Sequence, residues 1–165
     1  MAERVGAKAG GRSVNSELRQ LEPQSRDQAR NTAAIPQILP AQQDHFVSRH
    51  GMHFAGTHLI LDLWDAHNLS DSDIVEAGLR QAAEEAGATL LNLDLHCFTP
   101  NGGITGVAIL AESHISIHTW PERAYAAVDV FMCGDAEPYK AVEVLREAFQ
   151  PRRMTVSEHR RGVLT

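Results

Sequence analysis

The chain has 165 residues, enough for one compact domain, and 43% of them are hydrophobic. No apolar run approaches the roughly 18 residues that a membrane span needs, and residues 1–16 lack the apolar stretch of a secretory signal. A net charge of −6 is unlike the basic faces of nucleic-acid-binding proteins. We therefore expect a cytoplasmic protein that binds neither nucleic acid nor membrane.

Residues 1–50 differ in composition from the rest of the chain. They are rich in Gln, Arg, Ala and Ser, include three prolines, and hold only scattered large apolar residues. Such a segment cannot bury enough apolar surface to offset the entropy lost on ordering. We therefore expect residues 1–50 to be a disordered extension and residues 51–165 to form the folded domain.

The first expected elements are a strand over residues 56–63 and a helix that follows it. Ser70 is expected to cap the helix, with Asp73 completing a capping box, and Gly87 to end it in a left-handed conformation. The apolar stripe of this helix consists of Ile74, Val75, Leu79, Ala82, Ala83 and Ala86.

The remaining elements are four consecutive strands, a second helix and a last strand. The four strands are expected at Thr89–Phe98, Gly103–Ala111, Ser113–Trp120 and Tyr125–Met132. The helix runs from about Pro138 to Phe149, with Val142 and Leu145 facing inward, and Pro151 stops it. The last strand covers residues 153–158.

This order of elements, β-α-β-β-β-β-α-β, predicts the fold class. Short links between the central strands require hairpins, which make the sheet mainly antiparallel. Two amphipathic helices can cover only one face of such a sheet. We therefore expect an α+β fold, a two-layer αβ sandwich with both helices on one face. The other face must meet solvent, a ligand or another subunit.

The segment Glu112–Glu122, ESHISIHTWPE, carries the residues best suited to chemistry. In an extended strand, Ile115 and Ile117 share one face, which suits a core. The alternate positions, including His114 and His118, share the other face and can move protons. A half-exposed structural strand shows the same alternation, so the pattern alone does not define a function.

The sequence of this segment, followed by AAVD at 126–129 and FMCG at 131–134, resembles that of the prokaryotic S-adenosylmethionine decarboxylase proenzymes. The likeness extends from about Gly56 to Gly162 and ends on the block EHRRG at 158–162. It covers nearly all of the expected folded part and leaves the first 50 residues outside.

The resemblance implies that Ser113 attacks the carbonyl of Glu112 and cleaves the chain into a β chain, 1–112, and an α chain, 113–165. The cofactor would be a pyruvoyl group made from Ser113, whose carbonyl forms a Schiff base with the substrate amine and accepts electrons. Neither pyridoxal phosphate nor a metal is then expected.

The resemblance also assigns three supporting roles. His118 matches the base that acts during processing, and Thr105 stands where the family has a serine that supports the same step. Cys133 matches the proton donor of decarboxylation. Ser113 and His118 are five residues apart, on opposite faces of a regular strand, so we expect a bend or bulge between them. Cys97 matches no family role and is interpreted as structural.

Two further positions match the family's substrate contacts. Phe98 matches an aromatic residue that stacks on adenine, and Glu122 a carboxylate that binds the ribose hydroxyls. The loop Thr99–Gly103 is one residue longer than in the family, which affects the edge of this pocket. The substrate would be S-adenosylmethionine, its product an aminopropyl donor for spermidine or a related polyamine. The assembly would be a dimer of αβ units with sites near the interface.

Three alternatives remain open from the sequence. The same fold and self-cleavage could serve the decarboxylation of arginine or ornithine. A metal-binding or sensing module is suggested by His45, His50, His53 and His58, although no Cys or carboxylate framework has zinc-site spacing. The chain could also be a paralogue that folds but does not process.

Overall fold

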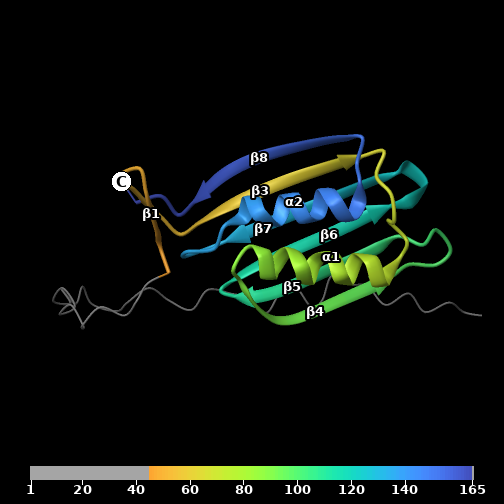
Figure 1. Ribbon diagram of the computed structural model, residues 1–165, viewed down its shortest axis with the longest axis horizontal. Helices are drawn as coiled ribbons and strands as arrows, with labels where there is room; N and C mark the ends of the chain where they lie inside the picture. The colour runs from red at the N-terminus through yellow and green to blue at the C-terminus, as the bar shows by residue number, and fades with distance from the viewer. Residues whose placement is uncertain (1–44, 165) are drawn as a thin grey trace, which may run out of the picture. The chain divides into compact units, whose positions relative to one another are not determined.

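The computed structural model describes residues 45–164, and its main feature is a six-stranded antiparallel sheet with two helices on one face (Figure 1). The strands are β3 (Gly56–Trp64), β4 (Thr89–Cys97), β5 (Ile104–Ala111), β6 (Ser113–Trp120), β7 (Tyr125–Met132) and β8 (Arg153–Arg161). Their order across the sheet is β4-β5-β6-β7-β3-β8. The expected two-layer αβ sandwich is confirmed.

Helix α1 (Ser72–Glu85) follows the expected stripe but begins one residue later than expected. Its N-cap is Asp71, whose Oδ1 accepts hydrogen bonds from the backbone N–H groups of Asp73 and Ile74, each at 3.1 Å. Ser70 as cap was wrong, because the Asp71 carboxylate satisfies both of these free N–H groups. The end is as expected: Gly87 has φ +74° and the chain closes with a left-handed turn.

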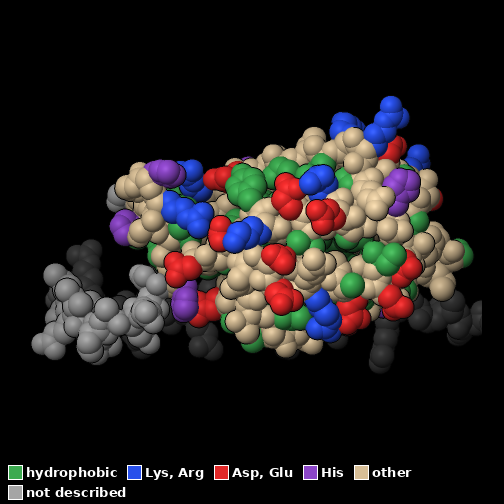
Figure 2. All heavy atoms as spheres, viewed as in Figure 1, with side chains coloured by type: hydrophobic (Ala, Val, Ile, Leu, Met, Phe, Trp, Pro, Cys, Tyr) green, Lys and Arg blue, Asp and Glu red, His purple; other side chains and the backbone are tan. Residues whose placement is uncertain are grey.

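Helix α2 (Pro138–Phe149) lies beside α1, and the core fills the space between the two helices and the sheet. Both helices bury one stripe, and their outer sides carry the ion pairs Arg80–Glu76, Lys140–Glu137 and Arg146–Glu143. Figure 2 shows the mixed acidic and basic side chains on this helix side of the molecule. On the sheet, the core includes Leu61, Ile117 and Val128, all nearly or fully inaccessible to solvent.

A short hairpin, β1 (Val47–Arg49) and β2 (Met52–Phe54), precedes the sheet. Sequence reasoning placed this stretch in a loose segment, but Val47 and Phe54 are 6% and 1% exposed and anchor it. The hairpin therefore straddles the expected domain boundary at residue 50. The rest of the expected extension, residues 1–44, lies outside the described residues.

Residues 45–164 lack two features, a membrane-spanning helix and a cluster of metal ligands. No helix in this range is long and apolar enough to cross a membrane. Within the same range, no three His, Cys, Asp or Glu side chains are placed so that they could hold a metal ion. The histidines at positions 45, 50, 53 and 58 are therefore not gathered into such a group.

We call the sheet face opposite α1 and α2 the open face, because neither helix covers it. It carries the alternate residues of each strand, such as Ile60 on β3, Ile109 on β5 and Trp120 on β6. These three side chains are 40%, 44% and 39% exposed. The open face is therefore more apolar than an ordinary solvated sheet face and presents the polar residues described next.

Candidate active site

Ser113 and Cys133 meet at one end of the sheet. Ser113 opens β6 after the tight turn from β5, and Cys133 follows the last residue of β7. Because β6 and β7 are antiparallel neighbours, these two strand ends lie side by side. The backbone N–H of Cys133 donates a hydrogen bond to Ser113 Oγ at 3.1 Å. The structure thus brings together the expected nucleophile and the expected proton donor.

The environment of Cys133 keeps its thiol protonated. Burial is the main cause that raises the pKa of Cys133, and the negative charge of Glu112 raises it further. A hydrogen bond with the Ser113 side chain acts in the opposite direction. A thiol whose pKa lies above its ordinary value carries its proton at neutral pH, which is the form required of a proton donor.

His118 and Thr105 form a second pair on the open face. They lie directly opposite each other on β6 and β5, and Thr105 Oγ1 is 2.9 Å from His118 Nδ1. This contact orients the imidazole of His118, which is exposed. The two residues expected to assist processing therefore do meet.

The expected bend between Ser113 and His118 was wrong. β6 keeps an unbroken register with β5 from Ser113 to His118 and with β7 from His114 to Trp120. Two continuous ladders hold the strand extended, so Ser113 belongs to the face of Ile115 and His118 to the open face. Five residues of strand separate their Cα atoms by about 16 Å. Within one chain, His118 does not reach Ser113.

Phe98 and Glu122 lie at the His118 end of the sheet. Phe98 follows β4, is 46% exposed and packs edge-to-face on His96 with ring centroids 4.6 Å apart. Glu122 is exposed in the short 3-10 helix η2 (Pro121–Arg123) that follows β6. The expected site residues therefore divide into two groups. One group is Glu112, Ser113 and Cys133, and the other, at the far end of β6, is Thr105, His118, Phe98 and Glu122.

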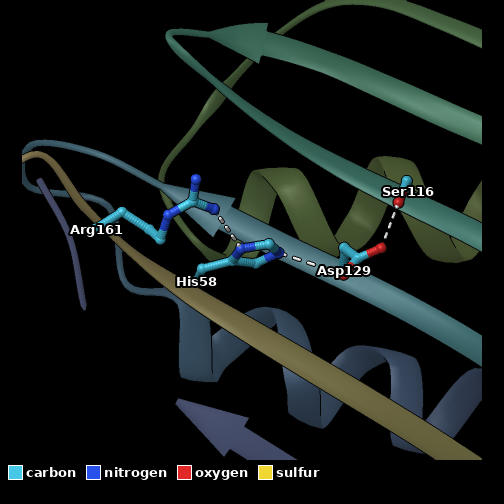
Figure 3. Close-up of polar contacts among 4 residues, drawn as sticks. All are labelled: His58, Ser116, Asp129 and Arg161. Atoms are coloured by element: carbon cyan, nitrogen blue, oxygen red, sulfur yellow. Dashed lines mark hydrogen bonds and ion pairs between the residues drawn. The ribbon is translucent and has the colours of Figure 1, made fainter. Parts of the chain in front are cut away.

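A polar network that sequence reasoning did not assign crosses the open face between these groups (Figure 3). His58 Nε2 is 3.3 Å from Asp129 Oδ1, and Ser116 Oγ donates to Asp129 Oδ2 at 3.0 Å. Arg161 approaches His58 Nδ1 at 3.3 Å. A guanidinium can only donate, so His58 accepts at Nδ1 and donates from Nε2 to the carboxylate. The pairing of β3 with β7 creates this contact between residues 71 positions apart.

His114 adjoins this network beside the cleavage site. Its ring packs against Phe131, with centroids 5.5 Å apart, and lies 6.3 Å from that of His58. Burial lowers the pKa of His114, and His58 lowers it further, whereas the charge of Asp129 raises it. The net direction favours a neutral imidazole next to Ser113.

Aromatic residues occupy the other end of the open face. Tyr125 packs between Trp64 and Trp120, with ring centroids 4.3 and 5.3 Å away. Its hydroxyl donates to Asp62 at 2.6 Å, and burial followed by this carboxylate raises the pKa of Tyr125 to about 12. These rings give the His118 end an apolar, partly exposed surface suited to contact with a flat aromatic group or another protein surface.

Comparison with known proteins shows which family the sequence matches. Residues 57–162 match the family model described as S-adenosylmethionine decarboxylase. The chain is 47% identical over 110 residues to the S-adenosylmethionine decarboxylase proenzyme of Thermomicrobium roseum, covering 66% of this chain and 95% of that protein. It is 51% identical over 109 residues to the proenzyme of Parasynechococcus marenigrum, covering 64% and 84%.

A solved structure agrees with these sequence matches. The adenosylmethionine decarboxylase from Aquifex aeolicus superposes with a TM-score of 0.59 at 34% identity, over 68% of this chain and 94% of that one. The resemblance predicted from the segment 112–122 is confirmed. The matched residues begin at position 57, so the hairpin β1–β2 lies outside the family match.

Proposed function

Since the chain belongs to the S-adenosylmethionine decarboxylase family, we propose that it cleaves itself between Glu112 and Ser113 and then decarboxylates S-adenosylmethionine. The observation that carries this proposal is the contact at the start of β6. A serine whose oxygen accepts a hydrogen bond from Cys133 N–H at 3.1 Å lies beside a thiol that keeps its proton.

The proposed cut uses only the chain's own atoms and water. Ser113 Oγ attacks the carbonyl carbon of Glu112, the C–N bond breaks, and the nitrogen takes the hydroxyl proton, which leaves an ester. A base removes the α-proton of residue 113, and the ester oxygen departs with the carboxylate of Glu112. Hydrolysis of the resulting dehydroalanine releases ammonia and leaves a pyruvoyl group. The products are the chains 1–112 and 113–165.

The surroundings of residue 113 fit this group. The pyruvoyl carbonyl would supply the electron sink that decarboxylation of an amino acid needs. Residue 113 is half-buried, adjoins the thiol of Cys133, and is bordered by the neutral imidazole of His114. In this arrangement Cys133 delivers the proton that replaces the lost carboxylate on the substrate carbon, and the protein body limits the access of water.

The separation between His118 and Ser113 supports a dimer. Processing needs a base near residue 113, yet His118 of the same chain lies about 16 Å along the strand and on the opposite face. A second copy packed on the open face would bring its own His118 and Thr105 to the backbone of residue 113, where the base removes the α-proton; the Ser113 side chain itself lies on the helix side. The exposed apolar residues Ile60, Ile109 and Trp120 give such packing a driving force.

The same arrangement supports the assignment of the substrate contacts. Phe98 and Glu122 lie with His118, so a dimer that brings His118 to the partner's residue 113 also brings an aromatic ring and a carboxylate. These groups suit the adenine ring and ribose hydroxyls of S-adenosylmethionine.

The product would serve as an aminopropyl donor for spermidine or a related polyamine. The free thiols Cys97 and Cys133 suit the reducing cytoplasm.

Mass spectrometry of the purified chain tests the cut. We expect two fragments, residues 1–112 and 113–165. The N-terminus of the shorter fragment should carry a pyruvoyl group in place of a free amine. Ser113→Ala removes the attacking oxygen and should leave the chain intact. An uncut parent chain after long incubation would contradict the proposal.

A CO2-release assay on the cut protein then tests the substrate. Release from S-adenosylmethionine is expected, and arginine and ornithine serve as competing substrates. Preferential release from either amino acid would keep the self-cleavage and reject the assignment of Phe98 and Glu122 to a nucleoside.

A further inference from the structure

An ordered segment outside the family match reaches the cleavage site. The hairpin β1–β2 precedes residue 57, where the match to the family begins. Val47 and Phe54 bury their side chains, and Ala55 N–H donates to Arg161 O at 2.8 Å. On the other side, Leu164 N–H donates to His53 O at 2.9 Å. The hairpin is therefore fixed to the domain by burial and by backbone hydrogen bonds.

His45, which lies two residues before this hairpin, touches both sides of the site. Its carbonyl oxygen accepts a hydrogen bond from Gly134 N–H at 2.8 Å, one residue beyond Cys133. Its Nε2 lies 3.6 Å from Oε1 of Glu112, the residue whose carbonyl Ser113 attacks. The consecutive amides of Cys133 and Gly134 thus hold Ser113 Oγ and His45 O respectively.

We propose that His45 is a positioning residue for self-cleavage, which holds the Glu112 side of the scissile bond against the Cys133–Gly134 turn. The proposal rests on the proposed cut at Glu112/Ser113. It adds a role for a residue that the family match does not include. His45 acts through Glu112 and does not take part in the bond changes themselves.

The physical reason lies in how the two ends of the scissile peptide are held. The Ser113 side is fixed by the β6 ladder and by the hydrogen bond from Cys133 N–H. Glu112 lies in the tight turn between β5 and β6, and its exposed side chain is restrained by the contact with His45. Restraining an attacked carbonyl near a nucleophile raises the fraction of time in which attack is possible.

The same contact has a second consequence after the cut. Cleavage makes Glu112 the last residue of the 1–112 fragment and adds a main-chain carboxylate to its side-chain charge. Both carboxylates then lie near Cys133, whose pKa is raised further by negative charge. The Gly134 hydrogen bond holds the His45 imidazole beside Glu112, so the imidazole lies next to these carboxylates after the cut.

The test measures the rate of cleavage of newly made full-length chain in a cell-free translation, sampled over time and analysed by mass spectrometry. His45→Ala should slow the cut by about two- to fivefold, the range that an exposed pair of this kind can contribute to a rate. His45→Gln keeps a donor of similar reach and should restore most of the rate. In the Glu112→Gln background, His45→Ala should cause a smaller loss.

His53→Ala is the matched control. His53 lies in the hairpin itself and its ring is 3.0 Å from the Ser48 hydroxyl; among residues 45–164 the contact of Glu112 with a histidine is with His45. The His53→Ala chain should cleave at the parent rate. Equal slowing by His53→Ala, no rescue by His45→Gln, or a parent-like rate for His45→Ala would each overturn the proposal while the parent chain still cuts. A parent chain that never cuts would instead overturn the proposed function and this inference with it.

Discussion

At the residue scale, the central question is how one end of β6 can serve both cleavage and proton donation. In the proposed mechanism, Ser113 loses a proton as it attacks, whereas Cys133 keeps one until carbon dioxide has left. The backbone N–H of Cys133 hydrogen-bonds the serine oxygen, and burial with the Glu112 charge raises the pKa of the thiol. The same few residues thus stabilise a serine oxygen that loses its proton and a neighbouring thiol that keeps its proton.

The pKa of Cys133 gives a prediction with a defined sign. In a precursor carrying Ser113→Ala and Cys97→Ser, the pH midpoint of iodoacetamide alkylation should lie above the ordinary thiol value of about 8.5. Adding Glu112→Gln removes a negative charge that disfavours the thiolate, so the midpoint should move to lower pH. The measurement is the alkylation rate against pH. An unchanged midpoint would show that Glu112 does not act on the thiol.

At the element scale, the two faces of β6 differ: one packs in the core and the other carries polar side chains. Ile115 and Ile117 are fully buried under the helices, while Ser116 and His118 lie on the open face. The ladders to β5 and β7 fix both sets at once, because a shift of one residue would exchange the faces. The packing of the core thereby sets where the reactive side chains point.

Ile117→Ala tests how much the buried face of β6 contributes to the stability of the fold. Removal of a fully buried aliphatic side chain should lower the free energy of unfolding by about 2–5 kcal/mol. Ser116→Ala, one position away on the open face, loses one hydrogen bond to Asp129 and should cost about 1 kcal/mol. Urea unfolding of both variants in the uncut Ser113→Ala background measures the difference. Equal losses would mean that the core does not extend under Ile117.

The elements that alternate clearly could be predicted from the sequence. The strands Ser113–Trp120 and Tyr125–Met132 have the expected bounds, and α2 covers the expected residues. The cap of α1 could not be decided, because Ser70 and Asp71 both suit an N-cap and the choice depends on the local path of the backbone. The hairpin before residue 56 was missed because its order comes from tertiary burial of Val47 and Phe54 and not from a local pattern.

The candidate site was predictable only in part, for a similar reason. The family resemblance singled out Ser113, His118 and Cys133, and the alternation of β6 already placed Ser113 and His118 on opposite faces. The expected bend assumed that one chain supplies both residues. The contact between His58 and Asp129 depends on β3 lying next to β7, a sheet order that no spacing in the sequence specifies.

At the scale of the whole molecule, the two groups of site residues lie at opposite ends of the same strand. A twofold axis that packs two open faces together would place the His118 end of one sheet over the Ser113 end of the other, twice in each dimer. Each site would then draw on both copies, and the network of His58, Asp129 and Arg161 would lie between the sheets. The hydrogen bonds of that network would satisfy its polar groups on burial.

Co-expression of two inactive variants tests this arrangement. A Ser113→Ala chain has no nucleophile but keeps His118, and a His118→Ala chain keeps the nucleophile but lacks the base. If each site is shared, a mixed dimer contains one complete site, formed by Ser113 of the second chain and His118 of the first. Random pairing places about half of the His118→Ala chains in mixed dimers, so up to about half of them should be cleaved.

Different tags on the two variants allow their masses to be assigned and mixed dimers to be purified. Cleavage should occur only in the His118→Ala chain, since the Ser113→Ala chain has no oxygen to attack with. Each variant expressed alone sets the background, which should be low for His118→Ala because both of its sites lack the base. If purified mixed dimers contain no cleaved chain, the base does not come from the partner. The strand would then have to rearrange before the cut, against both of the ladders that hold β6 extended.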